Sequence, residues 1–371
     1  MRILIAPDKF KGTLTGPEAA AAMAEGALRV YPDAVVTALP IADGGEGTVE
    51  AAVAAGFSER LNAVVGPIIK PVGAVWGFHE DSKVAVIETA QASGYLLSEP
   101  TVENSLRAHS YGCGQLIAAA MDAGATEIII GLGGSAMTDA GTGALRALGL
   151  KLLDAQGNLV PLGGGSLLDV VALDASGLDP RLADVKVRMA VDVDNPLYGL
   201  NGAAHIFGPQ KGADPDAVEL LDAGLRNLAS VVREATGVDI DTPGAGAAGG
   251  FPSTFIAYAG ALVERGFDLV ADLIELEKAL DEADLVITGE GSLDEQSLSG
   301  KGPLGVADAA HARGIPVVVV AGRITVTFEQ LAKHGVVAAV SATDVAGSPE
   351  AALADAARYT TRATSEALNG I

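Results

Sequence analysis

The feature that most constrains the fold of this chain is a repeated alternation of short β-branched runs with alanine-rich stretches, joined by glycine-rich turns. Several runs are apolar without alternation, which is typical of strands buried on both faces. The runs predict strands at residues 2–6, 35–41, 84–89, 127–131, 185–191, 285–288, 316–321 and 336–340. Helical periodicity predicts helices at residues 17–30, 45–55, 104–123, 215–236, 303–313 and 349–368. This alternation predicts an α/β fold with a mostly parallel sheet.

Two irregular stretches indicate a second domain, for which a chain of 371 residues is long enough. Residues 56–81 and 149–250 interrupt the alternation with glycine turns and short strands. We therefore expect a second α/β domain inserted into the first. The expected division assigns residues 1–56, 96–146 and 265–371 to the first domain, and residues 57–95 and 147–264 to the second.

Composition argues against several classes of function. The formal net charge of −23 opposes binding to nucleic-acid phosphates and to anionic lipid surfaces. The uncharged span 242–263 contains Pro243, Pro252 and several glycines, so it does not predict a membrane helix. Cys113 is the single cysteine, and the first residues lack the apolar core of a signal peptide. We expect a reducing, cytoplasmic compartment.

Loops rich in glycine, lysine or carboxylates follow five of the predicted strands, at the edge where open α/β sheets bind ligands. The first loop carries Asp8, Lys9 and Lys11. Two lysines ahead of a helix are suited to hold an anionic ligand group. The alternative interpretation is a solvated basic turn.

The second loop carries Asp43, Gly44, Gly45 and Glu46. Its glycines let a ligand approach the backbone, while the two carboxylates are candidates for Mg²⁺, which needs only one or two protein carboxylates when it is bound to a nucleotide. Taken alone, Glu46 is also typical of an acidic residue that complements a helix dipole.

The third loop, residues 131–143, is the strongest candidate for a phosphate cradle. It includes Gly133, Gly134 and Ser135, directly after an apolar strand and before a helical pattern. Backbone N–H groups in such a turn can converge on an anion, and the serine adds a hydroxyl. The alternative is a tight crossover, which rarely needs this many glycines.

The fourth loop carries Asp192 and Asp194, which lie on the same side if the strand continues through them. That geometry suits a metal ion or a proton acceptor, whereas an Asx turn that ends the strand is the alternative. Further along, Lys211 is suited to neutralise phosphate or is simply exposed. The fifth loop carries Glu290, Gly291 and Ser292, and continues to residues 300–302.

Common motifs of other enzyme classes are missing from the sequence. The glycine and lysine at 300–301 lack the spacing of a Walker A loop, and no kinase catalytic-loop signature of the eukaryotic type is present. Residues 244–249 match the dinucleotide-binding pattern, yet no strand precedes them, so we interpret them as a decoy or as a phosphate loop of another kind. The five histidines show no zinc-binding spacing, and we expect structural roles for them and for Cys113.

Together the five loops carry a resemblance to a known family. The segments at residues 6–11, 40–48, 131–136, 192–197 and 288–291 resemble those of the bacterial type I glycerate kinases, in the same order and over essentially the whole chain. The resemblance implies a flavodoxin-like or Rossmann-like mostly parallel sheet with a second α/β domain. It also implies ATP-dependent phosphorylation of D-glycerate, with 2-phosphoglycerate the favoured product. Two departures concern the cradle and its surroundings: Lys9 stands where many members have serine, and residues 137–140 differ from the usual sequence.

The chemistry of phosphoryl transfer suggests roles for these residues. The reaction needs positive charge around the transferred group, a metal ion that bridges phosphate oxygens, and a carboxylate that accepts the hydroxyl proton. We expect direct transfer in an interdomain cleft, with Asp192, Lys11 and Lys9 catalytic. The residues expected to bind substrate or phosphate are Asp8, Gly44, Gly45, Gly133, Gly134, Ser135, Lys211, Gly291 and Ser292. The residues expected to bind Mg²⁺ are Asp43, Glu46, Asp194 and Glu290.

Two alternatives stay open at this point. A nicotinamide-dependent oxidoreductase would use the glycine cluster to hold a dinucleotide, and a catalytically silent protein would bind the nucleotide and hydroxy acid without turnover. D-glycerate and ATP are the expected small-molecule partners, with no nucleic acid and no membrane. A homodimer is kept as an alternative to a monomer.

Overall fold

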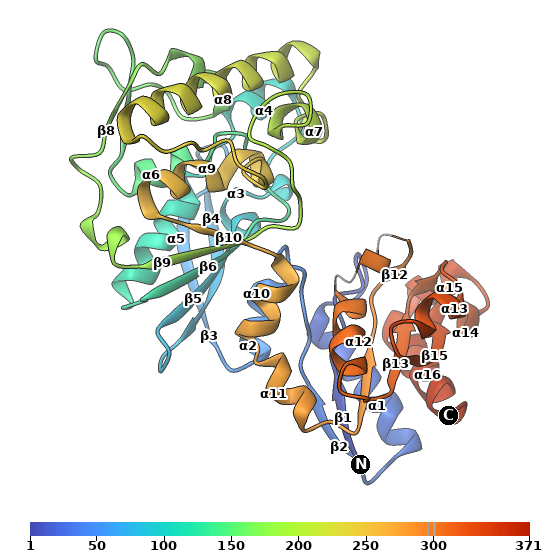
Figure 1. Ribbon diagram of the computed structural model, residues 1–371. Helices are drawn as coiled ribbons and strands as arrows, with labels where there is room; N and C mark the ends of the chain where they lie inside the picture. Colours follow the sequence, from blue (N-terminus) through green and yellow to red (C-terminus); the bar gives the residue numbers. More distant parts are fainter. Residues whose placement is uncertain (296, 300–301) are drawn as a thin grey trace. The chain divides into compact units, whose positions relative to one another are not determined.

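The chain folds into two compact units in the computed structural model, which describes residues 1–295, 297–299 and 302–371. Unit 1 comprises residues 1–43, 50–56 and 267–371, and unit 2 comprises residues 44–49 and 57–266. Most of unit 2 is thus one long insertion in the sequence of unit 1. Figure 1 labels the elements of both units.

A five-stranded parallel sheet forms the centre of unit 1. Its strands are β1 (Arg2–Ile5), β2 (Val35–Ala38), β11 (Leu285–Thr288), β13 (Val317–Ala321) and β15 (Val336–Ser341). The order β15-β13-β11-β1-β2 is the flavodoxin-like order, in which the direction of winding reverses between β1 and β11. The flavodoxin-like fold implied by the sequence resemblance is confirmed.

Alternating strand residues build a core on each face of this sheet. Ile3 and Ile5 pack with α1 (Gly16–Val30) and α16 (Ala356–Asn369), which lie side by side in Figure 1. Leu4 packs on the opposite face. The helices of that face are α2 (Thr48–Ala54), α10 (Gly266–Leu273), α11 (Leu276–Asp281), α12 (Pro303–His311) and α13 (Phe328–Ala332). Shorter elements complete the unit: β12 (Ser292–Leu293), η5 (Ser297–Ser299), β14 (Arg323–Ile324), α14 (Ala342–Ala346) and α15 (Pro349–Ala354).

Unit 2 contains a six-stranded mixed sheet in the order β10-β9-β6-β5-β4-β3. Strands β5 (Val84–Glu88), β6 (Glu127–Gly131), β9 (Lys186–Ala190) and β10 (Leu262–Glu264) are parallel. Strands β3 (Ser58–Val65) and β4 (Pro71–His79) add an antiparallel edge that contains the single tryptophan, Trp76. The carboxyl ends of the four parallel strands therefore share one edge of the sheet.

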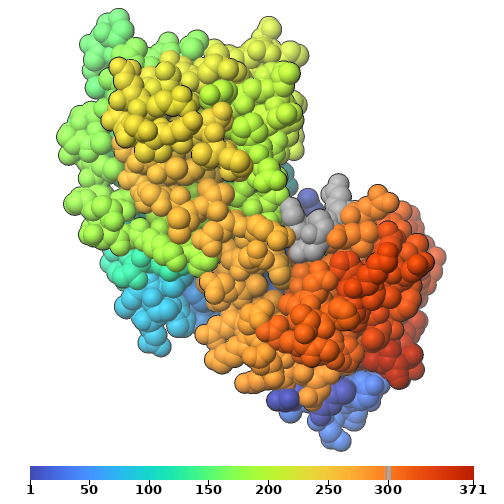
Figure 2. Space-filling view, in the orientation of Figure 1, coloured from blue at the N-terminus to red at the C-terminus, as the bar shows by residue number. Residues whose placement is uncertain are grey.

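The longest helix of unit 2, α8 (Pro215–Thr236), has clear sequence signals at both ends. The Asp214 carboxylate accepts the Ala217 N–H at the start, and Gly237 takes the left-handed conformation (φ 75°) just after the end. One face of α8 is buried, and the other lies on the outside of the unit, where its atoms are yellow-green to yellow in Figure 2.

The remaining elements of unit 2 are shorter. They are α3 (Thr89–Ser93), η1 (Tyr95–Leu97), α4 (Val102–Arg107), α5 (Tyr111–Asp122), α6 (Thr142–Ala147), β7 (Lys151–Leu153), η2 (Gly164–Asp169), β8 (Ala172–Asp174), η3 (Pro180–Ala183), α7 (Ala203–Phe207), η4 (Pro209–Lys211) and α9 (Ala247–Ala259). No helix in the described part of the chain is long and apolar enough to cross a membrane.

The units differ from the expected domain division chiefly at residues 96–146, which lie in unit 2. The reason is strand pairing: β6 pairs with β5 on one side and with β9 on the other. Residues 44–49 also belong to unit 2. Two predicted helices are each split, at residues 108–110 between α4 and α5 and at Asp355 between α15 and α16.

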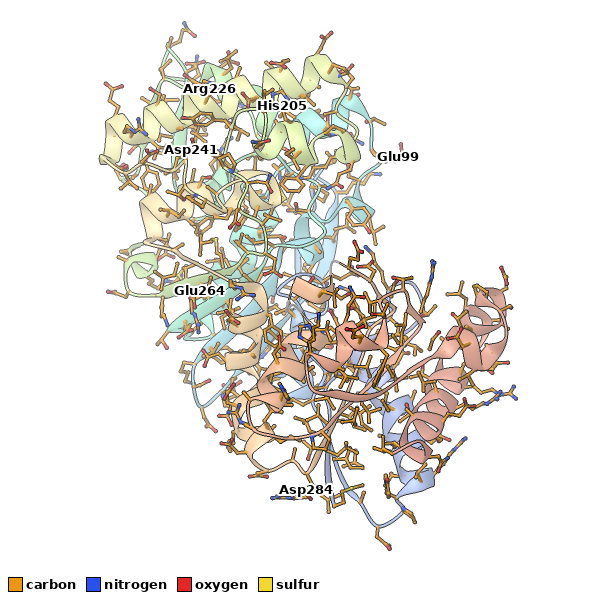
Figure 3. All side chains as sticks on the ribbon, turned by 45° about the vertical axis from the view of Figure 1, so that its right-hand side comes forward. Glu99, His205, Arg226, Asp241, Glu264 and Asp284 are labelled. Atoms are coloured by element: carbon orange, nitrogen blue, oxygen red, sulfur yellow. The ribbon has the colours of Figure 1, made fainter. Side chains whose placement is uncertain are left out.

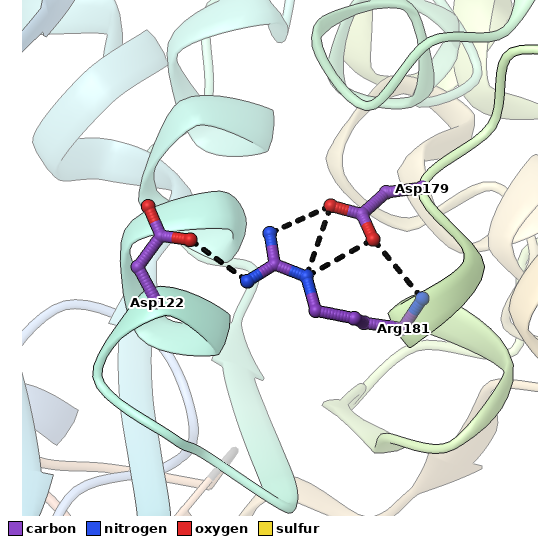
Figure 4. A network of polar contacts seen from close by, with 3 residues as sticks. All are labelled: Asp122, Asp179 and Arg181. Carbon is purple, nitrogen blue, oxygen red and sulfur yellow. Dashed lines mark hydrogen bonds and ion pairs between the residues drawn. The ribbon is translucent and has the colours of Figure 1, made fainter.

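Two arginines form ion pairs that join segments of unit 2 distant in sequence. Arg188 of β9 donates to Glu264, which Figure 3 labels at the end of β10. Arg181 donates to Asp179 beside it and to Asp122 at the end of α5, as Figure 4 shows. The exposed pair of Arg181 and Asp122 contributes little to stability, about 0–1 kcal/mol, whereas the Arg188 guanidinium is largely buried.

Candidate active site

The loops after β1 and β11 meet at the point where the strand order of unit 1 reverses. The Asp8 N–H donates to the Gly289 carbonyl at 2.8 Å, so backbone pairing continues beyond the strands. Gly291 has little room for a side chain, because a Cβ there would lie 3.0 Å from the Lys11 nitrogen. Asp8, Lys11 and Gly291 are thus brought together at the edge where flavodoxin-like sheets bind ligands.

Four carboxylates of unit 1 interact at this edge: Asp8, Asp43, Glu290 and Asp294. Burial raises the pKa of Asp8 to about 7, and repulsion from Asp43 adds to the rise. Burial also raises the pKa of Glu290; the Ser297 hydroxyl, which donates to Glu290 Oε1 at 2.6 Å, opposes this, while Asp294 and Asp43 add to it. Asp43 is exposed and the other three carboxylates are partly exposed, so a cation can reach this group of mutually repelling carboxylates.

The two lysines of the first loop are placed differently. The Lys9 N–H donates to Asp8 Oδ1 at 2.6 Å, and the positive charge of Lys9 lowers the pKa of Asp8 against the larger effect of burial. Lys11 is exposed. Ser292 is exposed at the start of β12, which pairs with β14. Gln296, Gly300 and Lys301, which belong to the fifth predicted loop, lie outside the described residues.

In unit 2, the glycine loop after β6 packs backbone against backbone on the loop at residues 44–46. The Leu132 N–H donates to the Gly44 carbonyl at 3.1 Å. A Cβ on Gly133 would lie 2.7 Å from the Gly45 Cα, and Gly134 takes a positive φ of 69°. Glycine is therefore required on steric grounds at Gly133, and Gly45, Gly133 and Gly134 are partly exposed where the two loops meet. Glu46 is exposed on that loop.

Glu88 holds this loop, and the sequence analysis missed it. It is the last residue of β5 and is 2% exposed. Its Oε1 accepts the N–H groups of Gly47 at 3.0 Å and Val49 at 2.8 Å, at the start of α2. The carboxylate therefore serves as a remote cap for that helix. The sequence offers no local signal for this role, because Glu88 occupies the last position of an apolar strand.

The fourth loop does not continue the strand. β9 ends at Ala190, so the condition under which Asp192 and Asp194 would lie on one side is not met. Asp192 Oδ1 accepts the Gly266 N–H at 3.0 Å, whereas Asp194 is exposed. Asp192 still lies near the glycine loop, because Ala190 pairs with Gly131 at the end of β6.

Lys211 is buried, with 6% of its surface exposed, which excludes the simple exposed-lysine alternative. Its Nζ donates to the Met137 carbonyl at 2.5 Å and to Ser135 Oγ at 3.4 Å. Burial lowers the pKa of Lys211 to about 7, while the charge of Asp139 opposes the fall. The amine therefore lies on the buried side of the glycine loop and links Ser135 to Met137 through two hydrogen bonds.

Asp139 anchors the far end of the same loop and is fully buried. Its carboxylate accepts four hydrogen bonds, from the N–H and hydroxyl of Ser110 (both 2.8 Å) and from the N–H groups of Gly141 and Gly143 (both 3.1 Å). Ser110 lies in the break between α4 and α5, so the helix is interrupted where the chain turns to meet Asp139.

Residues 244–249, which match a dinucleotide pattern, pack against the third and fourth loops. A Cβ on Gly249 would lie 2.0 Å from the Met137 carbonyl oxygen, and one on Gly246 would lie 2.2 Å from the Pro196 carbonyl oxygen. The glycines thus permit close backbone packing against the third and fourth loops, as expected for a decoy.

The histidines and the cysteine form no metal site in the part of the chain that the structure describes: no group of three or more His, Cys, Asp or Glu side chains there is arranged to hold a metal ion. Cys113 is buried, and burial raises the pKa of its thiol to about 12. Its Sγ contacts Ser93 Oγ in the core of unit 2.

The fold and the loops at its strand ends define a class of protein. A flavodoxin-like sheet with lysines and carboxylates at its switch point, together with a second α/β unit that carries a glycine-rich loop after a parallel strand, defines an α/β protein whose charged groups suit phosphoryl transfer.

Comparison with known proteins gives the particular family. A sequence model of the glycerate kinase family matches residues 3–371, so the chain belongs to this family. It is 47% identical to glycerate 2-kinase of Escherichia coli, over 92% of this chain and 90% of that protein. It is 45% identical to glycerate kinase of Bacillus subtilis, over 98% and 95% of the two chains. A crystal structure described as a glycerate kinase 2 of Salmonella typhimurium superposes with a TM-score of 0.86 at 40% identity, covering 100% of this chain and 99% of the other.

Proposed function

We propose that this chain transfers the γ-phosphoryl group of ATP directly to D-glycerate and that the product is 2-phosphoglycerate. The observation that carries the proposal is the meeting of Asp8, Lys11, Gly291 and Glu290 at the switch point of unit 1. The preference for the 2-phosphate is supported by the name of the Escherichia coli relative, glycerate 2-kinase.

The glycine loop of unit 2 fits a chain of phosphates. Gly133, Gly134 and Ser135 offer backbone N–H groups and a hydroxyl, and Gly44 and Gly45 complete a surface without side chains. An anion bound there gains from convergent N–H groups. In its protonated form Lys211 adds positive charge next to Ser135, because its Nζ lies 3.4 Å from that hydroxyl oxygen.

Unit 1 supplies charged groups of both signs. Lys9 and Lys11 hold the glycerate carboxylate or the transferring group, with Asp8, Gly291 and Ser292 beside them. Asp43 and Glu290 fit Mg²⁺, because their carboxylates are close enough to interact and Mg²⁺ is held by one or two protein carboxylates together with substrate phosphates. Glu46 and Asp194 are the candidates from unit 2. When bound, Mg²⁺ supplies the positive charge that neutralises the phosphate oxygens.

Asp192 is our candidate for the general base that accepts the proton of the glycerate hydroxyl. Asp192→Asn is expected to lower kcat about 10²-fold or more and to leave the KM for ATP nearly unchanged, because the amide cannot accept that proton. Steady-state kinetics across pH 5–9 provides the measurement, with the exposed Asp216→Asn as control. An Asp192→Asn enzyme with a normal kcat would remove Asp192 from this role.

Phosphorus NMR of the protein with Mg²⁺, ATP and D-glycerate tests the reaction itself. The expected spectrum shows ADP together with 2-phosphoglycerate. A 3-phosphoglycerate signal would keep the kinase and overturn the product, whereas no transfer at all would contradict the proposed function. In that case NADH binding would favour the oxidoreductase alternative, and binding of ATP and glycerate without turnover would favour the silent binder.

The setting of the enzyme is also part of the proposal. We place it in the cytoplasm, which is supported by the single buried thiol and by the acidic composition. A homodimer remains the alternative to a monomer, and sedimentation of the purified protein distinguishes the two.

A further inference from the structure

A short apolar segment beside the glycine loop has no role in the reaction described above. It is η1, in which Tyr95 is 48% exposed, Leu96 78% and Leu97 42%. The chain holds few aromatic residues, 4% of the total, and in the described residues Tyr95 and Phe328 are the exposed ones. Glu99, labelled in Figure 3, follows the segment.

Backbone contacts fix this segment directly to the glycine loop. The Tyr95 N–H donates to the Gly134 carbonyl at 2.8 Å, and Gly94 forms a bridge with Ser135. A Cβ on Gly134 would lie 3.7 Å from Tyr95 Cε1, so the tyrosine ring packs against the position where that side chain would begin. The ring therefore lies beside the peptide groups that we assign to phosphate.

The Lys211 loop borders the segment on its other end. A Cβ on Gly212 would lie 2.3 Å from the Pro100 carbonyl carbon, so the residue after Lys211 packs against the chain that follows η1. The exposed apolar side chains of Tyr95, Leu96 and Leu97 thus adjoin the peptide groups of the glycine loop, whereas Lys211 itself is buried. A ligand that contacts both the peptide groups and the apolar side chains must combine polar or anionic groups with a flat apolar part.

The chemistry of the two substrates indicates which of their groups binds to Tyr95, Leu96 and Leu97. D-glycerate is polar throughout, and the triphosphate and ribose of ATP are polar as well. The nucleobase is the one flat apolar group of the substrate pair, and bases stack on aromatic side chains. We propose that Tyr95, flanked by Leu96 and Leu97, is the platform on which the nucleobase of ATP stacks; this rests on the proposed assignment of the glycine loop to the phosphates.

Nucleotide affinity of variants tests the platform. Tyr95→Ala is expected to raise the KM for ATP and the Kd for ADP at least about tenfold and to leave the KM for D-glycerate within about twofold, because one stacking contact is lost. Tyr95→Phe retains the ring and keeps the Kd for ADP within about threefold. Phe328→Ala, which removes the other exposed aromatic side chain, is the control and leaves all three constants unchanged. Trp76 fluorescence verifies that each variant is folded.

Inorganic tripolyphosphate, titrated by calorimetry, separates stacking from loop structure. It has no base, so Tyr95→Ala should bind it as tightly as the parent chain does. Equal weakening of ADP and tripolyphosphate would mean that Tyr95 only braces the glycine loop, and unchanged ADP affinity would also overturn the platform. A changed sedimentation mass with unchanged ADP affinity would assign the patch to a second copy of the chain. Failure of the parent chain to bind either compound would contradict the proposed function itself.

Discussion

Asp139→Ala is expected to lower the free energy of unfolding of unit 2 by about 3–5 kcal/mol. The substitution removes the acceptor of four hydrogen bonds in a fully buried position. Three backbone N–H groups and one hydroxyl then lack their partner, and a buried donor without a partner costs about 1–3 kcal/mol. Lys211 also loses the carboxylate whose charge favours its protonated form.

Urea unfolding followed by Trp76 fluorescence measures this change in the correct unit, because Trp76 is the single tryptophan and lies buried in unit 2. Asp154→Ala is a matched control: Asp154 accepts the N–H groups of Gln156 and Asn158 within an exposed turn. There the released donors turn to water, so a much smaller change is expected. Equal losses in the two variants would contradict the argument that burial makes Asp139 important.

The strands of the fold could be predicted from sequence because buried parallel strands have an unmistakable composition. The run at β13 is four valines and an alanine, all fully buried. Such a run does not indicate which other strand it pairs with. The sequence of β6 is similar to those of the strands in unit 1, and residues 96–146 were therefore expected in that domain. In the structure β6 pairs with β5 and β9 of unit 2.

In the candidate site, too, residues marked by their neighbours in the sequence could be predicted, whereas residues defined by distant contacts could not. Glycines such as Gly133 and Gly291 could be singled out because their loops follow strands, and the structure shows why no larger residue fits there. Glu88 could not be found, because its partners at Gly47 and Val49 are 41 and 39 positions away in the chain. The prediction that Asp192 and Asp194 lie on the same side assumed that β9 continues through them, and the strand ends at Ala190.

The break at Ser110 was missed for a related reason. No proline or glycine occupies residues 108–110, so the helical periodicity predicts one helix through them. The interruption is caused by a distant acceptor, Asp139, which takes both the N–H and the hydroxyl of Ser110. A tertiary contact of a buried carboxylate therefore overrides local propensity at this point.

Lys211→Met is expected to separate stability from activity. The methionine has a similar volume and removes a buried amine whose charged form is costly. Below pH 7 unit 2 of the variant should be at least as stable as that of the parent chain. The kcat/KM should nevertheless fall about 10²-fold, because Ser135 and Met137 lose the group that ties them together and misplaced binding groups cost that much.

The free energy of unfolding of the parent chain is expected to depend on pH through Lys211. Burial lowers the pKa of Lys211 from 10.5 to about 7 in the folded chain. Between pH 7 and 10.5 the unfolded chain therefore binds the proton more often than the folded chain, so the free energy of unfolding rises with pH across that window. The rise amounts to roughly 5 kcal/mol at most, because the shift spans about 3.5 pKa units and one unit corresponds to about 1.4 kcal/mol. Lys211→Met lacks this rise.

Urea midpoints measured by Trp76 fluorescence at several pH values, for the parent chain, Lys211→Met and the exposed-lysine control Lys70→Met, test the expectation. Groups other than Lys211 cancel in the comparison, so the difference between parent and Lys211→Met isolates one amine. The control should follow the parent across the whole range. If Lys211→Met also runs parallel to the parent between pH 7 and 10.5, the buried amine keeps its ordinary affinity for protons, and the glycine loop is then held by a permanently charged lysine.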